Sequence, residues 1–290
     1  MFDFIITILL FSSMEAVSKP LMSYIDPFSL TFARFTLGFI VLFVFSFFTR
    51  DLRTLRNIPL RTVGLLAAAG FLNTFFSMTM LQKAVESGTA SMAALVFCTN
   101  PVFVYLIQLT MKKEKPTFLT TAGLVIALSG ITLVIARNGV SFNIGAIYAL
   151  AAAIAFAIFT LLNKKITKTV SAVNSNVVAF LFGIFFSFVF VSFTGKSLVF
   201  TSLFNDKLRL LAFLYLGIIV SGYCYITFLR TIKKFSPLSA SVVFLLKPGV
   251  ASIISFILLR ETPTLFFIIG LMLIFTGSIF ILWEKQAHTV

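Results

Sequence analysis

The chain has 290 residues, of which 59% are hydrophobic and only 11% are charged, so it carries more apolar surface than one water-soluble core can bury. The formal charge of +14 suggests a nucleic-acid partner at first, but Lys and Arg cluster in short segments between long apolar runs, which is typical of loops in membrane proteins. Composition therefore excludes a water-soluble globular protein, argues against nucleic-acid binding and predicts a lipid environment.

Ten apolar segments follow one another along the chain, and each is long enough to cross about 30 Å of hydrocarbon as a helix. Their ranges are 2–25, 28–49, 62–82, 87–111, 116–136, 138–163, 169–195, 210–229, 235–259 and 262–283. The first lacks the basic start and the cleavage site of a signal peptide, so it is interpreted as a spanning helix. Three apolar runs are interrupted by charge: the first by Glu15 and Lys19, the second by Arg34 and the ninth by Lys247.

Lys and Arg are distributed unevenly between alternate connections. Fourteen of the 23 follow even-numbered segments, and seven lie on the other side. Because cytoplasmic loops carry the excess of Lys and Arg, this distribution predicts a cell (inner or plasma) membrane protein with both termini in the cytoplasm.

An internal repeat relates residues 81–135 to residues 228–282 at an offset of 147 residues. The matched pairs include Pro101 with Pro248, Glu114 with Glu261, Gly123 with Gly270 and Gly130 with Gly277. Each half holds five segments, an odd number, so the second copy must run through the membrane in the opposite direction. The sequence therefore predicts an all-α integral membrane protein of ten transmembrane helices, built as two inverted five-helix repeats (1–138 and 139–290) around a central cavity.

The chain resembles EamA-type members of the drug/metabolite transporter superfamily over its whole length. The residues that carry the resemblance are Ser12-Ser13-Met14-Glu15, Pro27 followed by Arg34-Phe35, and two copies of Pro, then Glu-x-Pro-Thr, then Gly-x₆-Gly. The resemblance implies ten helices in two inverted repeats around a central cavity, and the export of amino acids or related metabolites. In the first segment, polar Ser12-Ser13 and acidic Glu15 replace a small or aromatic pair that is common in the family.

Glu15 is the only acidic residue of the first segment that is predicted to lie deep in the bilayer. It lies about 18 Å along the helix at 1.5 Å per residue, well inside the hydrocarbon. Since buried carboxylates in membranes generally face a bundle interior, Glu15 is a candidate for substrate binding and for proton coupling. The alternative is a structural pair with Lys19, four residues further along the same helix face.

Lys247 and its repeat partner Asn100 each stand directly before a proline. Lys247 lies about 15 Å into its segment. Pro248 and Pro101 lack an N–H, so both helices are expected to bend and to expose polar backbone beside these side chains. Lys247 is predicted to hold an anionic group of the substrate, or else to be a buried counter-ion for Glu15.

Arg34 has two interpretations. Its long side chain can extend to the headgroups, or it can form an ion pair within the bundle, with Glu15 as a possible partner. Weaker candidates for lining a cavity, which helix–helix hydrogen bonding explains equally well, are Asn73, Ser77, Gln82, Asn163, Tyr223 and Tyr225. The small residues Gly123, Ala127, Gly130, Gly270 and Gly277 are predicted to let two helices pack closely.

These features favour a secondary transporter that exports a small zwitterion or organic acid by alternating access. Glu15 and Lys247 would hold its two ends, and Glu15 would couple transport to protons. A lipid-intermediate or headgroup flippase of the same fold is the alternative. An enzyme is not expected, because the single histidine, His288, is in the tail and no metal-ligand or nucleophile arrangement can be assembled; a channel lacks its filter motif. The expected partners are the substrate and the lipid bilayer, with no cofactor, no metal and no obligate protein partner.

Overall fold

The computed structural model describes residues 2–48, 55, 58–88, 90–112, 116–137, 144–194, 201–259 and 264–287. Side chains are described throughout these ranges except at Ser91, Ile135, Arg137, Thr194, Ser202, 251–259 and 285–287. The loop arginines Arg50, Arg53 and Arg56 and the repeated Glu114 and Glu261 lie outside the described residues.

Every element in the described ranges is a helix, so the all-helical prediction is confirmed. The elements are α1 (Phe2–Ser18), the short η1 (Lys19–Ser23), α2 (Pro27–Phe48), α3 (Leu60–Gly70), η3 (Phe71–Ser77), α4 (Met78–Ser87), α5 (Ala90–Phe97), α6 (Asn100–Thr110), α7 (Phe118–Arg137), α8 (Ile144–Ile166), α9 (Ala172–Thr194), α10 (Thr201–Phe204), α11 (Lys207–Leu214), η4 (Tyr215–Tyr223), α12 (Cys224–Lys234), α13 (Pro237–Leu259) and α14 (Leu265–Ala287).

Eight of the described helices are long and apolar enough to cross a membrane. Two shorter apolar stretches, Phe118–Val134 in α7 and Pro237–Val250 in α13, accompany them. Large hydrophobic side chains stay exposed on the outer faces of these helices, as Phe188 on α9 and Met272 on α14 do, which fits an apolar solvent.

Two of the long helices change their hydrogen-bonding pattern halfway. Residues Phe71–Ser77 and Tyr215–Tyr223 are π-helical, each between two α-helical stretches of one continuous helix. Moving the first segment by the repeat offset of 147 residues places it on residues 218–224, so the two wide turns occupy matching places in the repeat. Such wide turns often mark functional positions in helices.

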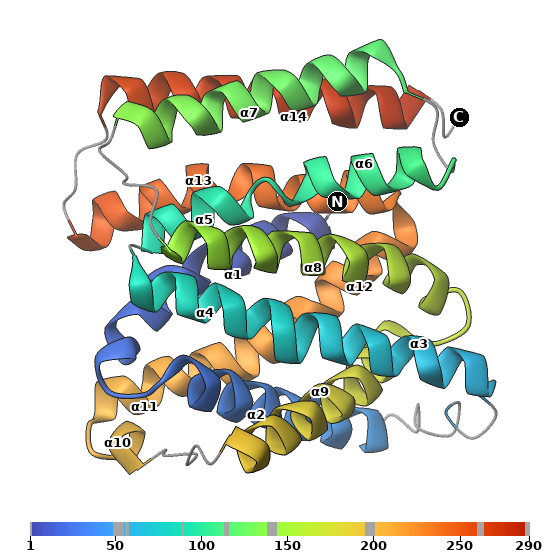
Figure 1. The fold of residues 1–290 in the computed structure, drawn as a ribbon, viewed down its shortest axis with the longest axis vertical. Helices are drawn as coiled ribbons and strands as arrows, with labels where there is room; N and C mark the ends of the chain where they lie inside the picture. The colour runs from blue at the N-terminus through green and yellow to red at the C-terminus, as the bar shows by residue number, and fades with distance from the viewer. Residues whose placement is uncertain are drawn as a thin grey trace.

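The helix is interrupted beside the repeated proline in one copy only. Cys98 and Thr99 form a turn that separates α5 from α6, and Asn100 and Pro101 start α6; the ribbon narrows at this turn in Figure 1. Here Pro occupies the first turn of a new helix, where its missing N–H costs nothing. Helix α13, in contrast, continues through Pro248.

Helices α7 and α14 lie side by side at one end of the molecule (Figure 1). A Cβ atom added to Gly123 would lie 2.7 Å from the Gly277 carbonyl oxygen, and one added to Gly130 would lie 2.5 Å from that of Gly270. Gly123 faces Gly277 and Gly130 faces Gly270, so moving forward along α7 corresponds to moving backward along α14. The two helices therefore run antiparallel. The predicted close packing of these glycines is confirmed.

Candidate functional site: a buried ion pair beside a third charge

Glu15 and Lys247 form an ion pair in the interior of the helix bundle. The Lys247 ammonium Nζ donates to Glu15 Oε1 at 2.5 Å, and the residues are 0% and 3% exposed. Glu15 lies on α1 and Lys247 on α13, 232 positions later in the chain. The contact therefore joins the N-terminal part of the chain to the C-terminal part.

The pair is only partly satisfied by the described residues. The second carboxylate oxygen, Glu15 Oε2, is buried and accepts no hydrogen bond from the described residues. Removing charges from water costs several kcal/mol per ion, and pairing offsets that cost fully only when the remaining lone pairs are also bonded. The ion pair therefore allows two charges to lie in the interior of the bundle, where the burial of either charge alone would cost more free energy.

Arg34 on α2 is a third fully buried charge, with 0% exposure. Its guanidinium carbon lies 4.8 Å from the centre of the Phe35 ring, and its charge is within electrostatic range of Glu15 and Tyr225. The nitrogens Nε, Nη1 and Nη2 donate no hydrogen bond to the described residues. The interpretation in which Arg34 reaches the headgroups is wrong, because its side chain lies within the bundle.

A network of nine aromatic rings contacts two of these charges, Arg34 and Lys247. Neighbouring ring centres are 4.8–6.5 Å apart, and the rings belong to Phe11, Phe35, Phe97, Phe156, Phe159, Phe180, Tyr225, Phe228 and Phe244. The Lys247 ammonium lies over the Phe97 ring at 5.7 Å, much as Arg34 lies over Phe35. Ring faces attract cations, so the aromatic residues hold both positive charges in place without neutralising them.

The predicted polar residues divide into three groups. Asn73 belongs to the site, since the Tyr225 hydroxyl donates to Asn73 Oδ1 at 3.1 Å. Ser77 and Asn163 are buried, but donate to backbone carbonyls, those of Ala152 (2.8 Å) and Phe159 (2.9 Å). Within the described ranges, Gln82 and Tyr223 form no hydrogen bond with the ion pair. Gln82 is buried, with neither amide atom bonded to a described residue, whereas the Tyr223 side chain is 42% exposed on an outer face of the bundle.

Asn100 makes a contact that matches the one of its repeat partner Lys247. Its Nδ2 donates to the Ala153 carbonyl of α8 at 2.8 Å, so α6 is joined to α8 as α13 is joined to α1. Asn100 therefore reaches from α6 to α8, and Lys247 reaches from α13 to α1. In both cases the residue before the repeated proline contacts the first long helix of the other part of the chain. One of these two contacts is ionic and the other is neutral.

Lys19 and Lys164 bind backbone carbonyls at the ends of helices, a role that the sequence did not predict for either residue. Lys19 Nζ donates to the carbonyls of Val85 and Gly88, both at 2.7 Å, and lies 3.5 Å from that of Glu86. Lys164 Nζ donates to the carbonyls of Ile232 (3.0 Å), Lys233 (3.2 Å) and Phe235 (2.5 Å). The three acceptors of one lysine lie 147 positions from those of the other, which equals the repeat offset. Lys19 is thus not the partner of Glu15.

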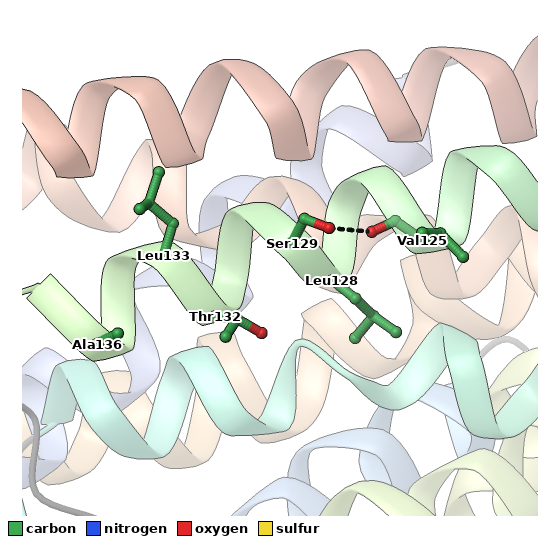
Figure 2. A pocket seen from close by; sticks show the side chains of 6 residues that line it. All are labelled: Val125, Leu128, Ser129, Thr132, Leu133 and Ala136. Carbon is green, nitrogen blue, oxygen red and sulfur yellow. Dashed lines mark hydrogen bonds between the residues drawn. The ribbon is translucent and has the colours of Figure 1, made fainter.

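A shallow surface pocket lies away from these residues, on the outer face of α7. Figure 2 shows its six lining side chains, all from that helix: Val125, Leu128, Ser129, Thr132, Leu133 and Ala136. The Ser129 hydroxyl bonds the Val125 carbonyl of its own helix at 2.9 Å, so the pocket offers little polar chemistry. Within the described ranges, no three His, Cys, Asp or Glu side chains lie close enough to hold a metal ion.

Comparisons with known proteins agree with this architecture. The model of the EamA-like transporter family matches residues 2–136 and again residues 143–283. An uncharacterized transporter of Clostridium kluyveri is 30% identical over 95% of this chain and 91% of its own length. One of Archaeoglobus fulgidus is 26% identical over 90% and 89%, and YxxF of Bacillus subtilis, also an uncharacterized transporter, is 25% identical over 76% and 70%.

A solved structure, titled "Crystal structure of protein", shares the fold, with a TM-score of 0.77 over 100% of this chain and 98% of its own at 18% identity. The family match covers nearly the whole chain in two copies, and the apolar helices agree with a multi-pass membrane protein. The chain therefore belongs to the EamA-like transporter family, within the drug/metabolite transporter superfamily.

Proposed function

We propose that the protein is a secondary transporter that exports a small zwitterion or organic acid by alternating access, with its substrate site at the Glu15–Lys247 pair. The observation that carries this proposal is the pair itself: two opposite charges, 0% and 3% exposed, that join α1 to α13. Ionisable residues inside a membrane usually mark a substrate or ion pathway. The family supports transport over enzymatic activity.

The proposed architecture has ten transmembrane helices in two inverted five-helix repeats, residues 1–138 and 139–290. The eight long apolar helices and the two shorter stretches support this count. The antiparallel contact of α7 with α14, which hold the matching glycines of the two copies, supports the inversion, because equivalent helices of inverted repeats run in opposite directions.

In the proposed cycle, the ion pair is a contact between the two halves that the substrate replaces. An ammonium or hydroxyl group of the substrate takes the place of Lys247 on Glu15, and a carboxylate takes the place of Glu15 on Lys247. Neutral contacts between the halves would also have to open on one side of the membrane at a time. Two of them are Thr7 with Thr227 (2.8 Å) and Ser13 with Tyr215 (2.7 Å).

Proton coupling by Glu15 is part of the proposal. Once the substrate has left Glu15, and before Lys247 returns to it, the carboxylate has no ammonium partner. Glu15 would then take up a proton from the side on which the substrate is released and return it when the cavity reopens. We further propose that the protein lies in the cell membrane with both termini in the cytoplasm, which the uneven distribution of Lys and Arg supports.

Uptake into proteoliposomes tests the substrate class. Amino acids, amines and organic acids are each offered as competitors for the transport of a labelled member of the set. Competition by zwitterions or organic acids is the expected outcome. Competition by permanent cations alone would contradict the proposal, because a cation has no group for Lys247.

A further inference from the structure

The buried charges of the site do not sum to zero. Among the described residues, the buried side chains of the site that carry a formal charge at neutral pH are Glu15, Arg34 and Lys247. Two are cations and one is an anion, so their formal charges sum to +1. Burying an unbalanced charge is costly, and it persists in membrane proteins mainly where it serves function.

Acidic residues near the helix ends are engaged away from the site. Asp26 accepts hydrogen bonds from the backbone N–H groups of Phe28 and Ser29 at the start of α2. Asp206 accepts from Arg209 N at the start of α11, and Glu284 accepts from the hydroxyls of Thr117 and Thr120. These contacts hold three of the described carboxylates away from the surplus positive charge.

Arg34 and Asn73 have buried hydrogen-bond donors without a partner in the described residues. The three guanidinium nitrogens have no acceptor among the described residues, and neither has Asn73 Nδ2, whose amide oxygen already accepts from Tyr225. Among the charged groups of the site, the buried acceptor without a partner in the described residues is Glu15 Oε2. An ionised carboxylate has acceptors only, and the guanidinium fork matches its geometry, so a carboxylate is the group that this set of donors recognises best.

Resting on the proposed function, we propose that the substrate is a carboxylate with a net charge of −1 and that Arg34 binds it together with Lys247. A neutral zwitterion leaves the surplus charge of the site in place, and a dianion such as phosphate over-compensates it beside Glu15. The substrate carboxylate takes the place of Glu15 on Lys247 and also lies against Arg34, whose guanidinium is over the Phe35 ring, and a hydroxyl or ammonium group of the same molecule faces Glu15 Oε2. Arg34 thereby selects organic acids over neutral amino acids.

The first test needs no substrate. Arg34→Met removes an unpaired buried charge, so the purified variant is expected to unfold at the same temperature as the parent or at a higher one. Arg230→Met serves as the matched control, since Arg230 is exposed on α12. A clear loss of thermal stability in Arg34→Met, without one in Arg230→Met, would overturn the proposal, because Arg34 would then be a structural partner of Glu15.

The second test uses two isosteric probe pairs, glutamate with glutamine and lactate with alanine, in proteoliposomes. The parent is expected to prefer the member of charge −1 in each pair by roughly tenfold or more, the factor for one charge-assisted hydrogen bond. Arg34→Gln is expected to lose this preference, Arg34→Lys to keep part of it and Arg230→Gln to keep all of it. Preference for the neutral members, or an unchanged preference in Arg34→Gln, would overturn the role of Arg34 while leaving transport intact. If no amino acid, amine or organic acid is transported at all, the proposed function fails instead, and the stability comparison still decides the role of Arg34.

Discussion

Lys19 and Lys164 make the same contact at two places in the molecule, each with its ammonium group on the last carbonyls of a helix, and their acceptors lie 147 residues apart. Lys19 follows α1 and binds the end of α4, whereas Lys164 lies on α8 and binds the end of α12. Lys19 therefore joins two helices of the N-terminal part of the chain, and Lys164 joins two helices of the C-terminal part. The contacts between the two parts, such as Glu15 with Lys247, involve other residues.

Removing either lysine is expected to lower stability by a similar amount. Lys19→Ala and Lys164→Ala each leave carbonyls at a helix C-terminus without a cation, which costs about 1 kcal/mol. Both variants should show a lower midpoint of thermal unfolding than the parent. Lys165→Ala, at an exposed position one residue further, is the control and should unfold like the parent. A loss in only one of the two variants would contradict their equivalence.

The members of the ion pair are expected to differ in their effect on stability. Glu15→Gln leaves two buried cations without an anion, and breaking a buried pair in this way costs about 3–5 kcal/mol. Lys247→Gln leaves Glu15 within electrostatic range of Arg34, so its loss should be smaller. The double variant should be more stable than Glu15→Gln alone. Thermal unfolding of the three purified variants decides the order, and equal losses in both single variants would contradict the three-charge arrangement.

Glycine has a specific packing role in α7. Gly130→Ala places a methyl group 2.5 Å from the Gly270 carbonyl oxygen and should destabilise the protein by about 1–3 kcal/mol through overpacking. Gly64→Ala in α3 adds the same group where nothing lies within 4 Å. Since Ala favours a helix over Gly by about 1 kcal/mol, this control should be neutral or stabilising. Equal unfolding midpoints for the two variants would contradict the close contact of α7 with α14.

The sequence indicated the charged residues of the site, but not how they pair. A charge in a long apolar run is conspicuous whatever the fold, so Glu15, Arg34 and Lys247 could all be identified. Their partners depend on which helices meet. Lys19, four residues from Glu15, was the nearest candidate in sequence, yet it caps α4, and the actual partner is 232 positions away.

Depth alone also misled the interpretation of Arg34. Its distance from the end of the helix allows it to reach the headgroups, but its direction around the helix axis, toward Phe35 and the aromatic network, places it in the interior. The lysine caps were missed because Lys19 was considered as a partner for Glu15 and Lys164 only as a charge near a loop. Lys19 directly follows α1 and Lys164 lies in the last turn of α8, so both are at the end of the first long helix of their part of the chain, and this correspondence was the available signal. The all-helical membrane fold followed from composition, whereas the count of ten spans and their inversion remain predictions.

The proposed orientation can be tested with single cysteines in a variant that lacks Cys98 and Cys224. Lys168 and Asn205 are both exposed at the ends of helices, in connections predicted to lie on opposite sides. In intact cells, a membrane-impermeant thiol reagent should label Asn205→Cys and should label Lys168→Cys only after the cells are opened. The reverse pattern would place the termini outside, and equal labelling of both from outside would contradict the inverted repeat.

Proton coupling predicts that a pH gradient drives accumulation of the substrate in proteoliposomes. Glu15→Gln cannot exchange a proton, so it should lose gradient-driven accumulation, whereas Arg230→Gln, which changes an exposed charge, should retain it. Accumulation that persists undiminished in Glu15→Gln would remove Glu15 from the coupling. Its absence from the parent as well would remove proton coupling and leave facilitated diffusion.

The most direct test of a substrate site at Glu15 and Lys247 is the exchange of a labelled substrate across proteoliposomes with no pH gradient, for the parent, Glu15→Gln, Lys247→Gln and Arg230→Gln. Because both members of the pair contact the substrate in the proposed cycle, each of the first two variants should lose roughly tenfold or more of the exchange rate at low substrate concentration. Arg230→Gln should exchange at the parental rate. Exchange at the parental rate in both Glu15→Gln and Lys247→Gln would contradict the assignment of the transport site to this buried pair.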